Sequence, residues 1–315
     1  MELNKIICGD TLETVKTFSD ESIDCVITSP PYWQLRDYGW TGQWGLEKTY
    51  QEYLDKMIVL MAELKRVLKP TGTMWINLGD SYNGNKEGST HQISVKKDLN
   101  ENQSGLSKKC QNNIPNKSLI LIPHRFAIRC VDELGLILRN DIIWAKRNGM
   151  PESVTDRFSK KHEFFFFFVK NQKYYFDLDG VRCEYSEAGK QRSKYLFGGN
   201  KGGLDRIQSG APMGDKSHLI ENGKNPGDIS DFWDVPTQPS SDKHYATYNF
   251  DLIDKPIVCG CPEGGVILDP FCGTGTTLLR AEQLNRKSIG IDGSKEYCEI
   301  AGKRLENFRK QLKLF

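Results

Sequence analysis

Residues 28–33 combine chemical groups that seldom stand together: a threonine, a serine, two prolines, a tyrosine and a tryptophan. They follow residues 23–27, a short β-prone run, so they come where a strand is expected to end. Ser29 precedes a proline, which disfavours the helical region for it, and each proline fixes its own φ. The pattern predicts a stiff, extended loop with a polar acceptor beside aromatic rings. A plain turn that closes the strand is the alternative.

A second group of candidate residues begins at Asp269, directly after the apolar residues 266–268. Residues 269–277 read Asp-Pro-Phe-Cys-Gly-Thr-Gly-Thr-Thr, which predicts a strand, a Gly-x-Gly turn and the start of a helix. Glycines let the backbone approach a ligand, and the amides of a helix start favour a negative group. Asp292 ends the next predicted strand, where an acidic side chain can accept hydrogen bonds from ribose hydroxyls.

These features favour a nucleoside ligand that lacks a diphosphate. The dinucleotide fingerprint requires a third glycine where Leu278 stands, and no Gly-Lys-Ser/Thr follows the turn, which excludes a P-loop. The nine cysteines form no Cys-x-x-Cys pair, so neither a disulfide framework nor a four-cysteine metal site is indicated, and no metal is expected.

The predicted elements bring the candidate residues to one edge of a sheet. Apolar residues at three- and four-residue spacing predict a helix over 50–68, which the residues 69–72 end before a strand at 73–78. Strand, helix and strand then follow one another as in a parallel βαβ unit. Ligands of open α/β sheets bind at the carboxyl ends of the strands. The residues expected there are Asp10, Ser29, Gly273 and Asp292.

Composition limits the classes of protein. No apolar run approaches the roughly 18 residues that a membrane helix needs, and the first residues lack the pattern of a secretory signal, so we expect a cytoplasmic protein. The net charge of +2 alone says nothing about nucleic acid. Lysines and arginines over residues 96–147 are compatible with a phosphate-backbone partner, and a solvated surface is the alternative.

Both motifs resemble those of one enzyme family. Residues 269–277 resemble the Phe-x-Gly-x-Gly motif of S-adenosylmethionine-dependent methyltransferases, and residues 29–32 resemble the Asp/Asn/Ser-Pro-Pro-Tyr/Phe motif of amino-methylating DNA methyltransferases. The catalytic motif precedes the cofactor loop, as in the β group of that family. The resemblance implies an α/β fold with an open, doubly wound, mostly parallel sheet, which is the Rossmann-like class I methyltransferase fold with a circularly permuted motif order.

The resemblance also implies roles for individual residues. Gly9-Asp10 is similar to the element that contacts the adenine of the cofactor, and residues 244–247 are similar to the segment at its methionine end. Gly293 departs from the family pattern, in which proline is common. The implied catalytic residues are Ser29, Pro30, Pro31 and Tyr32. The implied S-adenosylmethionine-binding residues are Asp10, Thr28, His244, Asp269, Phe271, Gly273, Thr274, Gly275, Thr276, Thr277 and Asp292.

The implied reaction is methyl transfer to an exocyclic amino group. Its lone pair is delocalised into the base, and the Ser29 hydroxyl and the Pro30 carbonyl would accept its two hydrogens and turn the lone pair toward the donor. Tyr32 would stack on a base flipped out of the duplex. Methylation at carbon 5 of cytosine uses a Pro-Cys nucleophile, and this sequence contains no Pro-Cys dipeptide.

Serine in the motif is more typical of cytosine-N4 methylation, whereas aspartate or asparagine is more typical of adenine-N6 methylation, so cytosine is our first expectation and adenine the second. Methylation of RNA or of a protein glutamine, and a catalytically silent DNA-binding module, are the remote alternatives. The expected division is a catalytic part over 1–178 with a mobile loop at about 83–117, an inserted target-recognition region over 179–241, and a cofactor-binding part over 242–315. Double-stranded DNA is the expected partner, and a homodimer and a separately acting restriction endonuclease stay open.

Overall fold

The computed structural model describes residues 2–37, 39–40, 42–84, 111, 113–149, 152–182, 230–237 and 249–312. The chain divides into two compact units: Met1–Phe176 together with Asp231–Phe315, and Asp177–Ser230. Within the described part of the smaller unit, a short 3-10 helix, Asp179–Val181, is followed by Arg182, whose guanidinium pairs with Asp179 at 2.8 Å. The remaining description concerns the larger unit.

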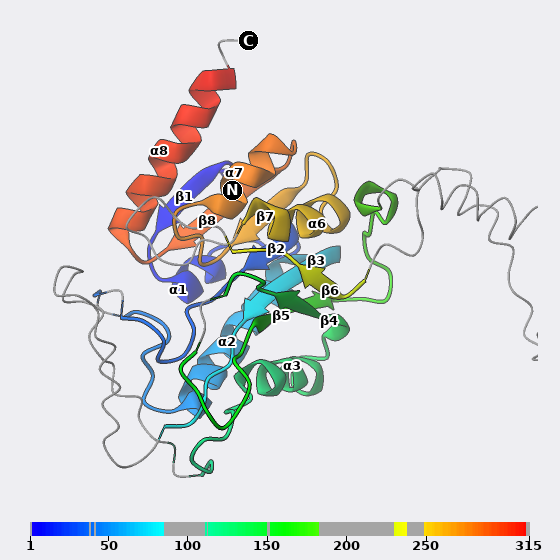
Figure 1. The fold of residues 1–315 in the computed structure, drawn as a ribbon. Helices are drawn as coiled ribbons and strands as arrows, with labels where there is room; N and C mark the ends of the chain where they lie inside the picture. The colour runs from blue at the N-terminus through cyan, green and yellow to red at the C-terminus, as the bar shows by residue number, and fades with distance from the viewer. Residues whose placement is uncertain are drawn as a thin grey trace, which may run out of the picture. The chain divides into compact units, whose positions relative to one another are not determined.

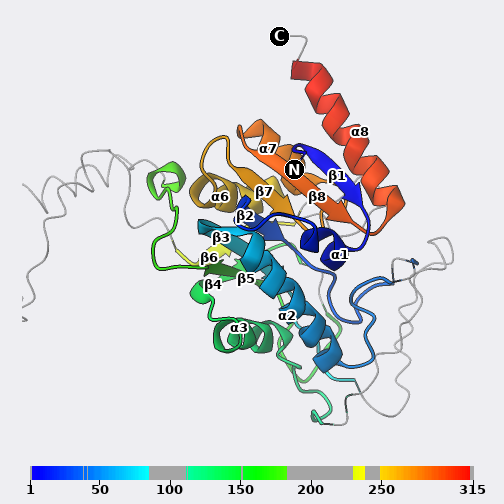
Figure 2. The ribbon, with the colours of Figure 1, turned by 180° about the vertical axis from the view of Figure 1, so that it is seen from behind.

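A single sheet runs through the larger unit, and Figures 1 and 2 show it from opposite sides. In the described part of the chain it has eight strands. The neighbouring strands β1, β8, β7, β2 and β3 are parallel, β5 is antiparallel to both β3 and β4, and β6 is parallel to β4. Across the sheet their bounds are β1 Lys5–Cys8, β8 Lys287–Asp292, β7 Val266–Asp269, β2 Ile23–Thr28, β3 Leu68–Leu78, β5 His162–Val169, β4 Ile137–Ala145 and β6 Phe232–Asp234.

Helices cover both faces of this sheet. On one face α1 (Thr11–Lys16) contacts α2 (Tyr50–Val67), which contacts α3 (Ile122–Asp132). On the other face α6 (Phe250–Gly260), α7 (Thr276–Gln283) and α8 (Lys295–Leu312) follow one another. The predicted fold class, an open and doubly wound α/β sheet with mostly parallel strands, is confirmed.

The central βαβ unit forms where the periodicity predicts it, with one difference at its turn. Thr49 caps α2 by accepting a hydrogen bond from the Glu52 amide at 3.1 Å, and nine residues of the helix are buried. The helix ends at Val67, one residue before the predicted end, and no separate turn follows, because β3 begins at Leu68. The Lys69 ammonium lies 2.8 Å from both carboxylate oxygens of Asp24 in β2, which holds this early part of the strand in place.

Strand β6 is an element that the sequence does not predict. The segment up to residue 241 was expected to be an irregular insert, but β6 pairs with residues 143–145 of β4, and Trp233 packs on Phe165 with ring centroids 5.7 Å apart. Three residues are too few to display a period of two. The expected boundary at 241 therefore lies beyond the larger unit's own strand, since the smaller unit ends at Ser230.

Other expectations concern residues outside the described part of the chain. These are residues 244–247 with His244, residues 85–110 and 112 of the expected mobile loop, and residues 183–229 and 238–241 of the expected insert. Among the described helices, none is long and apolar enough to cross a bilayer.

Candidate active site

A buried carboxylate joins the ends of the two central strands. Asp269, the last residue of β7, is 1% exposed, and the Thr28 hydroxyl at the end of β2 donates to it at 2.7 Å across 241 positions of sequence. The Thr277 hydroxyl donates to its other oxygen at 2.6 Å, and the Phe271 amide donates at 3.1 Å. These donors compensate the carboxylate for the loss of water. The structure thus fixes residues 29–32, the catalytic motif, relative to residues 271–275, the glycine loop.

The two glycines of the glycine loop differ in their surroundings. Both have positive φ, +51° at Gly273 and +79° at Gly275, which side chains adopt only with strain. A Cβ at Gly275 would lie 2.9 Å from the Ala301 Cβ of α8, whereas a Cβ at Gly273 would meet no atom within 4 Å. Gly275 is therefore required for packing, and the backbone at Gly273 borders open space.

Two threonines of the glycine-loop region are engaged with α8. The Arg304 guanidinium donates to the Thr274 carbonyl at 2.7 Å and to the Thr276 hydroxyl at 3.4 Å. Thr276 is only 7% exposed. Both residues are cofactor contacts in the sequence-based prediction, and the structure shows them holding the last helix against the loop.

Asp292 lies where the sequence predicts, next to the glycine loop. Its carboxylate accepts hydrogen bonds from the Gly273 amide at 2.9 Å and the Ser294 amide at 2.8 Å, and burial raises its pKa above the usual range. Each carboxylate oxygen retains a lone pair for a ligand. The Gly9 amide donates to the Asp292 carbonyl at 2.9 Å, so the predicted adenine element, Gly9-Asp10, lies beside it.

The catalytic motif is held from β3. The Ser29 hydroxyl donates to the side-chain oxygen of Asn77 at 3.2 Å. The Asn77 amide nitrogen donates to the Phe164 carbonyl of β5 at 3.0 Å, which fixes the oxygen toward the motif. Asn77 is 1% exposed. The Ser29 proton is thereby directed into the protein, and its lone pairs are left for a ligand.

Tyr32 is held from β3 and β5 together. Its hydroxyl donates to the Glu163 carboxylate at 2.7 Å and lies 2.8 Å from Asn77 Oδ1, and the other Glu163 oxygen pairs with Lys146. Burial and the Glu163 charge raise the Tyr32 pKa well above its usual value, so the phenol stays protonated. Its ring edge packs on Gly79, where a Cβ would lie 2.6 Å from Tyr32 Cε2. The orientation of the ring is therefore fixed.

Comparison with known proteins agrees with this arrangement. Residues 23–303 match the model of the N6/N4 methylase family, described as DNA methylase. The chain belongs to this DNA methylase family.

Relatives of this methylase match it over nearly their full lengths. The Type II methyltransferase M.Cfr9I of Citrobacter freundii is 34% identical over 97% of this chain and 89% of its own length. The Type II methyltransferase M.SmaI of Serratia marcescens is 34% identical over 96% of this chain and 90% of its own.

Solved structures share the fold of the methylase. The cytosine-N4-specific PvuII DNA methyltransferase has a TM-score of 0.61 at 19% identity, covering 95% of this chain and 85% of its own. A DNA modification methylase of Thermus thermophilus, described as putative and solved with S-adenosyl-L-methionine, has a TM-score of 0.57 at 21% identity, covering 96% of this chain and 95% of its own.

Three residues that hold the motif have no predicted role: Asn77, Glu163 and Lys146. One signal was present, because Asn77 is a polar side chain near the end of an apolar strand, and a buried amide needs partners. Glu163 and Lys146 could not be paired with Tyr32 from sequence, since their approach depends on the position of β5 between β3 and β4.

The cysteines near the site of the methylase are not activated as nucleophiles. Burial raises the pKa of the Cys25 and Cys272 thiols well above their usual value, so both stay protonated. Among the described residues, no group of three or more His, Cys, Asp or Glu side chains is arranged to hold a metal ion.

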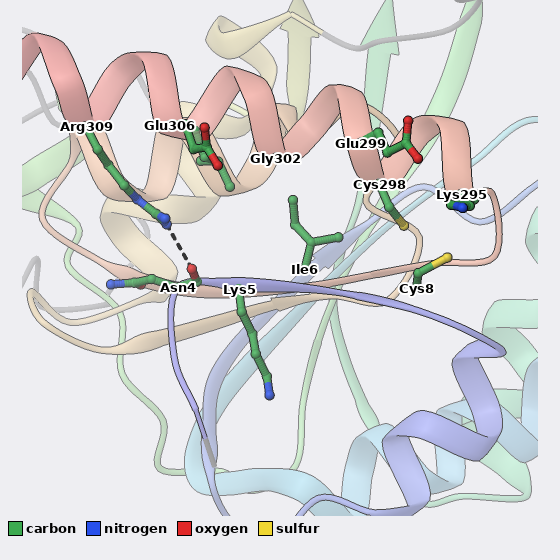
Figure 3. Close-up of a pocket in the computed structure, with 11 residues that line it drawn as sticks. Asn4, Lys5, Ile6, Cys8, Lys295, Cys298, Glu299, Gly302, Glu306 and Arg309 are labelled. Atoms are coloured by element: carbon green, nitrogen blue, oxygen red, sulfur yellow. Dashed lines mark hydrogen bonds between the residues drawn. The ribbon is translucent and has the colours of Figure 1, made fainter.

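Two cavities open in the larger unit. One, of about 460 Å³, adjoins the catalytic motif, because its lining residue Asp80 directly follows Gly79, which Tyr32 contacts. The cavity is lined by Asp80, Tyr82, Leu119, His124, Arg157, Phe158, Ser159, Lys160, His162 and Phe164. The other, of about 370 Å³, lies between β1 and α8 (Figure 3). There the sulfur atoms of Cys8 and Cys298 face one another, and Cys298 donates to the Asp292 carbonyl at 3.5 Å. One residue that lines this second cavity, Cys298, is thus in contact with the backbone of Asp292.

Proposed function

We propose that this DNA methylase transfers a methyl group from S-adenosylmethionine to the exocyclic N4 amino group of a flipped-out cytosine within a short site of duplex DNA. The observation that carries the proposal is the buried Asp269 carboxylate, to which Thr28 and Thr277 both donate. It holds the catalytic motif and the glycine loop at one edge of the sheet, where ligands of such folds bind. A methyl donor at the loop and an amino group at Ser29 would meet there.

The residues near the glycine loop fit S-adenosylmethionine. The Gly273 backbone borders open space, and the Asp292 carboxylate keeps lone pairs for ribose hydroxyls. When bound, this cofactor supplies an electrophilic methyl group on a sulfonium sulfur. We assign direct contacts to Asp10, Phe271, Gly273 and Asp292. We assign a positioning role to Thr28, Thr274, Gly275, Thr276, Asp269 and Thr277, because their contacts hold the catalytic motif, the glycine loop and α8 together. His244 keeps its proposed place at the methionine end.

Ser29 and Pro30 supply the acceptors for the amino group. Because the Ser29 proton is donated to Asn77, the lone pairs of its oxygen are available to an amino hydrogen. The Pro30 carbonyl, stiffened by Pro31, is the second acceptor. Two acceptors in fixed positions draw the amino lone pair out of conjugation and align it for in-line attack, which is catalysis by positioning and electrostatics.

Tyr32 holds the target base in the plane that this geometry requires. Its ring is fixed by Gly79 and its hydroxyl by Glu163, so a base stacked on it has a defined orientation. A base within a duplex cannot reach a crevice at a sheet edge, so the nucleotide must flip out. The cations beside the neighbouring cavity are engaged within the protein, since Arg157 pairs with Glu152 and Lys160 donates to the Asp80 carbonyl.

Two observations support cytosine over adenine. Ser29 stands where the motif of this family has serine, aspartate or asparagine, and serine is the more typical residue of the N4 branch. The PvuII enzyme, with a similar fold, is described as cytosine-N4-specific. The amino group of adenine presents the same two hydrogens, so adenine N6 is the alternative product.

Identification of the methylated nucleoside tests the proposal. Unmethylated DNA is incubated with the enzyme and methyl-labelled S-adenosylmethionine, digested to nucleosides and analysed by mass spectrometry. We expect labelled N4-methylcytosine, and none with Ser29→Ala at equal enzyme concentration. N6-methyladenine alone would overturn the choice of base, and label in neither nucleoside would overturn the reaction.

Further partners follow from the relatives. M.Cfr9I and M.SmaI are named Type II methyltransferases. We propose a separately acting restriction endonuclease as the functional counterpart of this protein, and residues 179–241, apart from the three residues of β6, as the region that recognises the DNA site. Sequencing the modified positions in a DNA library would reveal that site.

A further inference from the structure

The described residues between positions 33 and 47, namely 33–37, 39–40 and 42–47, are called the crossing loop, and they connect the catalytic motif with the cofactor side of the crevice. It begins and ends beside the motif: the Gln34 amide donates to the Gly45 carbonyl at 2.6 Å, and a Cβ at Gly45 would lie 2.9 Å from the Tyr32 carbonyl. The Trp33 indole donates to the Glu47 carbonyl at 3.0 Å. These contacts close the base of the loop, and the residues between them include Trp40 and Trp44, which contact the cofactor side.

Trp44 anchors the crossing loop on the cofactor side. Its indole nitrogen is 3.4 Å from the Asp10 carboxylate, and its ring meets Phe271 edge-on with centroids 5.3 Å apart. The Lys56 ammonium of α2 lies 4.2 Å from the ring centroid. Trp44 is only 1% exposed, so it is a fixed part of the wall between the two halves of the site.

Trp40 lies against Gly293, the residue after Asp292. A Cβ at Gly293 would lie 2.0 Å from Trp40 Cη2 and 2.5 Å from Cζ2, which is closer than a Cβ atom can approach another carbon atom. The benzo ring of the indole thus occupies the space that a side chain at position 293 would take. Unlike Trp44, Trp40 is partly exposed. The absence of a side chain at Gly293, a departure from the family pattern, is matched by an aromatic ring from a distant part of the chain.

We infer that Trp40 is a cofactor-contacting residue that supplies the aromatic surface for the adenine of S-adenosylmethionine. The inference rests on the proposed function, in which Asp292 takes the ribose hydroxyls. The purine attached to that ribose would lie within reach of Gly293, the residue next to Asp292. Gly293 has no side chain, and the indole of Trp40 occupies its place. A base can stack on an aromatic side chain because both rings present a flat π-face, so an indole is a suitable surface for adenine.

The crossing loop then gives the cofactor and the target base a shared wall. One end of the loop packs on Tyr32, and its middle carries Trp40 to Gly293.

Titration calorimetry with the full chain and three variants tests the inference without any need for turnover. Trp40→Ala is expected to raise the Kd for S-adenosylmethionine about tenfold, and Trp40→Phe, which keeps an aromatic ring, about threefold. Leu35→Ala is the matched control: it removes a side chain of the same loop that is 49% exposed, and should leave the Kd unchanged. Thermal melting of each variant checks that the fold is kept.

Two further probes sharpen the assignment. 5′-Methylthioadenosine carries the nucleoside without the methionine, so Trp40→Ala should weaken its binding by the same factor. Gly293→Ala, which displaces the indole without removing it, should weaken both ligands. An unchanged Kd in Trp40→Ala, a tighter Kd, or a loss confined to S-adenosylmethionine would each overturn the inference. Absence of S-adenosylmethionine binding by the unaltered chain would instead overturn the proposed function.

Discussion

The catalytic motif and the glycine loop follow the ends of two neighbouring strands, β2 and β7, but they are held in different ways. Prolines and side chains fix the catalytic motif: Asn77 accepts from Ser29, and Glu163 accepts from Tyr32. In the glycine loop the backbone itself is what is held: two glycines have positive φ, the Gly273 amide donates to Asp292, and the Thr274 carbonyl accepts from Arg304. The difference follows from their tasks, because a base needs oriented acceptors whereas a cofactor needs a backbone that it can approach.

This contrast predicts that turnover and cofactor affinity can be damaged separately. Substitutions in the network around Ser29 and Tyr32 should reduce the rate with little effect on the Kd for S-adenosylmethionine. Substitutions around Asp292 should weaken cofactor binding first. Only Asp269, which accepts hydrogen bonds from both sides, should affect both.

Asp269→Ala removes the acceptor that the catalytic motif and the glycine loop share, and it should have the largest effect on stability. It leaves buried donors of Thr28, Thr277 and Phe271 without their acceptor, which should lower the free energy of unfolding by about 3 kcal/mol. Urea denaturation measures this loss. The control is Asp254→Ala, whose ion pair with Arg280 is partly exposed and should contribute less than about 1 kcal/mol. Equal losses in the two variants would contradict a special role for Asp269.

Tyr32→Ala should lower kcat about 100-fold and change the Kd for S-adenosylmethionine less than about twofold, because base orientation is lost but the cofactor loop is untouched. Tyr32→Phe keeps the ring and removes the hydrogen bond to Glu163, so its loss should be smaller. Single-turnover methylation and calorimetry give the two quantities. An unaltered rate in Tyr32→Ala would remove this residue from the base-stacking role.

Asp292→Ala should raise the Kd for S-adenosylmethionine about 10- to 100-fold, the loss expected for hydrogen bonds to a charged group. The rate at saturating cofactor should fall much less. Calorimetry on Asp292→Ala and Asp292→Asn separates loss of charge from loss of shape. Unchanged affinity in both variants would contradict the ribose assignment.

The two glycines sharpen the comparison within one loop. Gly275→Ala combines a positive φ with a contact of 2.9 Å to Ala301, and should destabilise the fold by about 2 kcal/mol. Gly273→Ala meets no atom within 4 Å, so it should cost about 1 kcal/mol from backbone strain alone and weaken cofactor binding. Thermal denaturation with and without S-adenosylmethionine distinguishes them. A smaller loss of stability in Gly275→Ala than in Gly273→Ala would be inconsistent with this packing.

The pH dependence of cofactor binding gives the smallest effect. Burial raises the Asp292 pKa, so this acid loses its charge at a higher pH than an exposed aspartate does. Affinity that depends on the carboxylate is present above that pKa and falls as the pH is lowered through it, by up to about tenfold per pH unit below. Calorimetry over a series of decreasing pH values should show the decline in the unaltered chain and none from this group in Asp292→Asn.

The fold and both motifs could be predicted because their signals are local. Helix α2 follows from the spacing of its apolar residues, and the Gly-x-Gly turn follows from two glycines after a short strand. The supporting contacts are not local. Glu163 reaches Tyr32 across 131 positions because β5 inserts between β3 and β4, and Trp40 meets Gly293 from the opposite end of the chain. The residue pattern at those positions predicts neither the pairing of β5 nor the course of the loop that carries Trp40.

A crystal structure of the protein with S-adenosylhomocysteine, the demethylated cofactor, tests the central claim most directly. The account predicts that the ligand lies between the catalytic motif and the glycine loop, with its ribose hydroxyls on Asp292 and its adenine against Trp40. A ligand bound in the cavity between β1 and α8, or any site from which Ser29 and Gly273 are both remote, would contradict it.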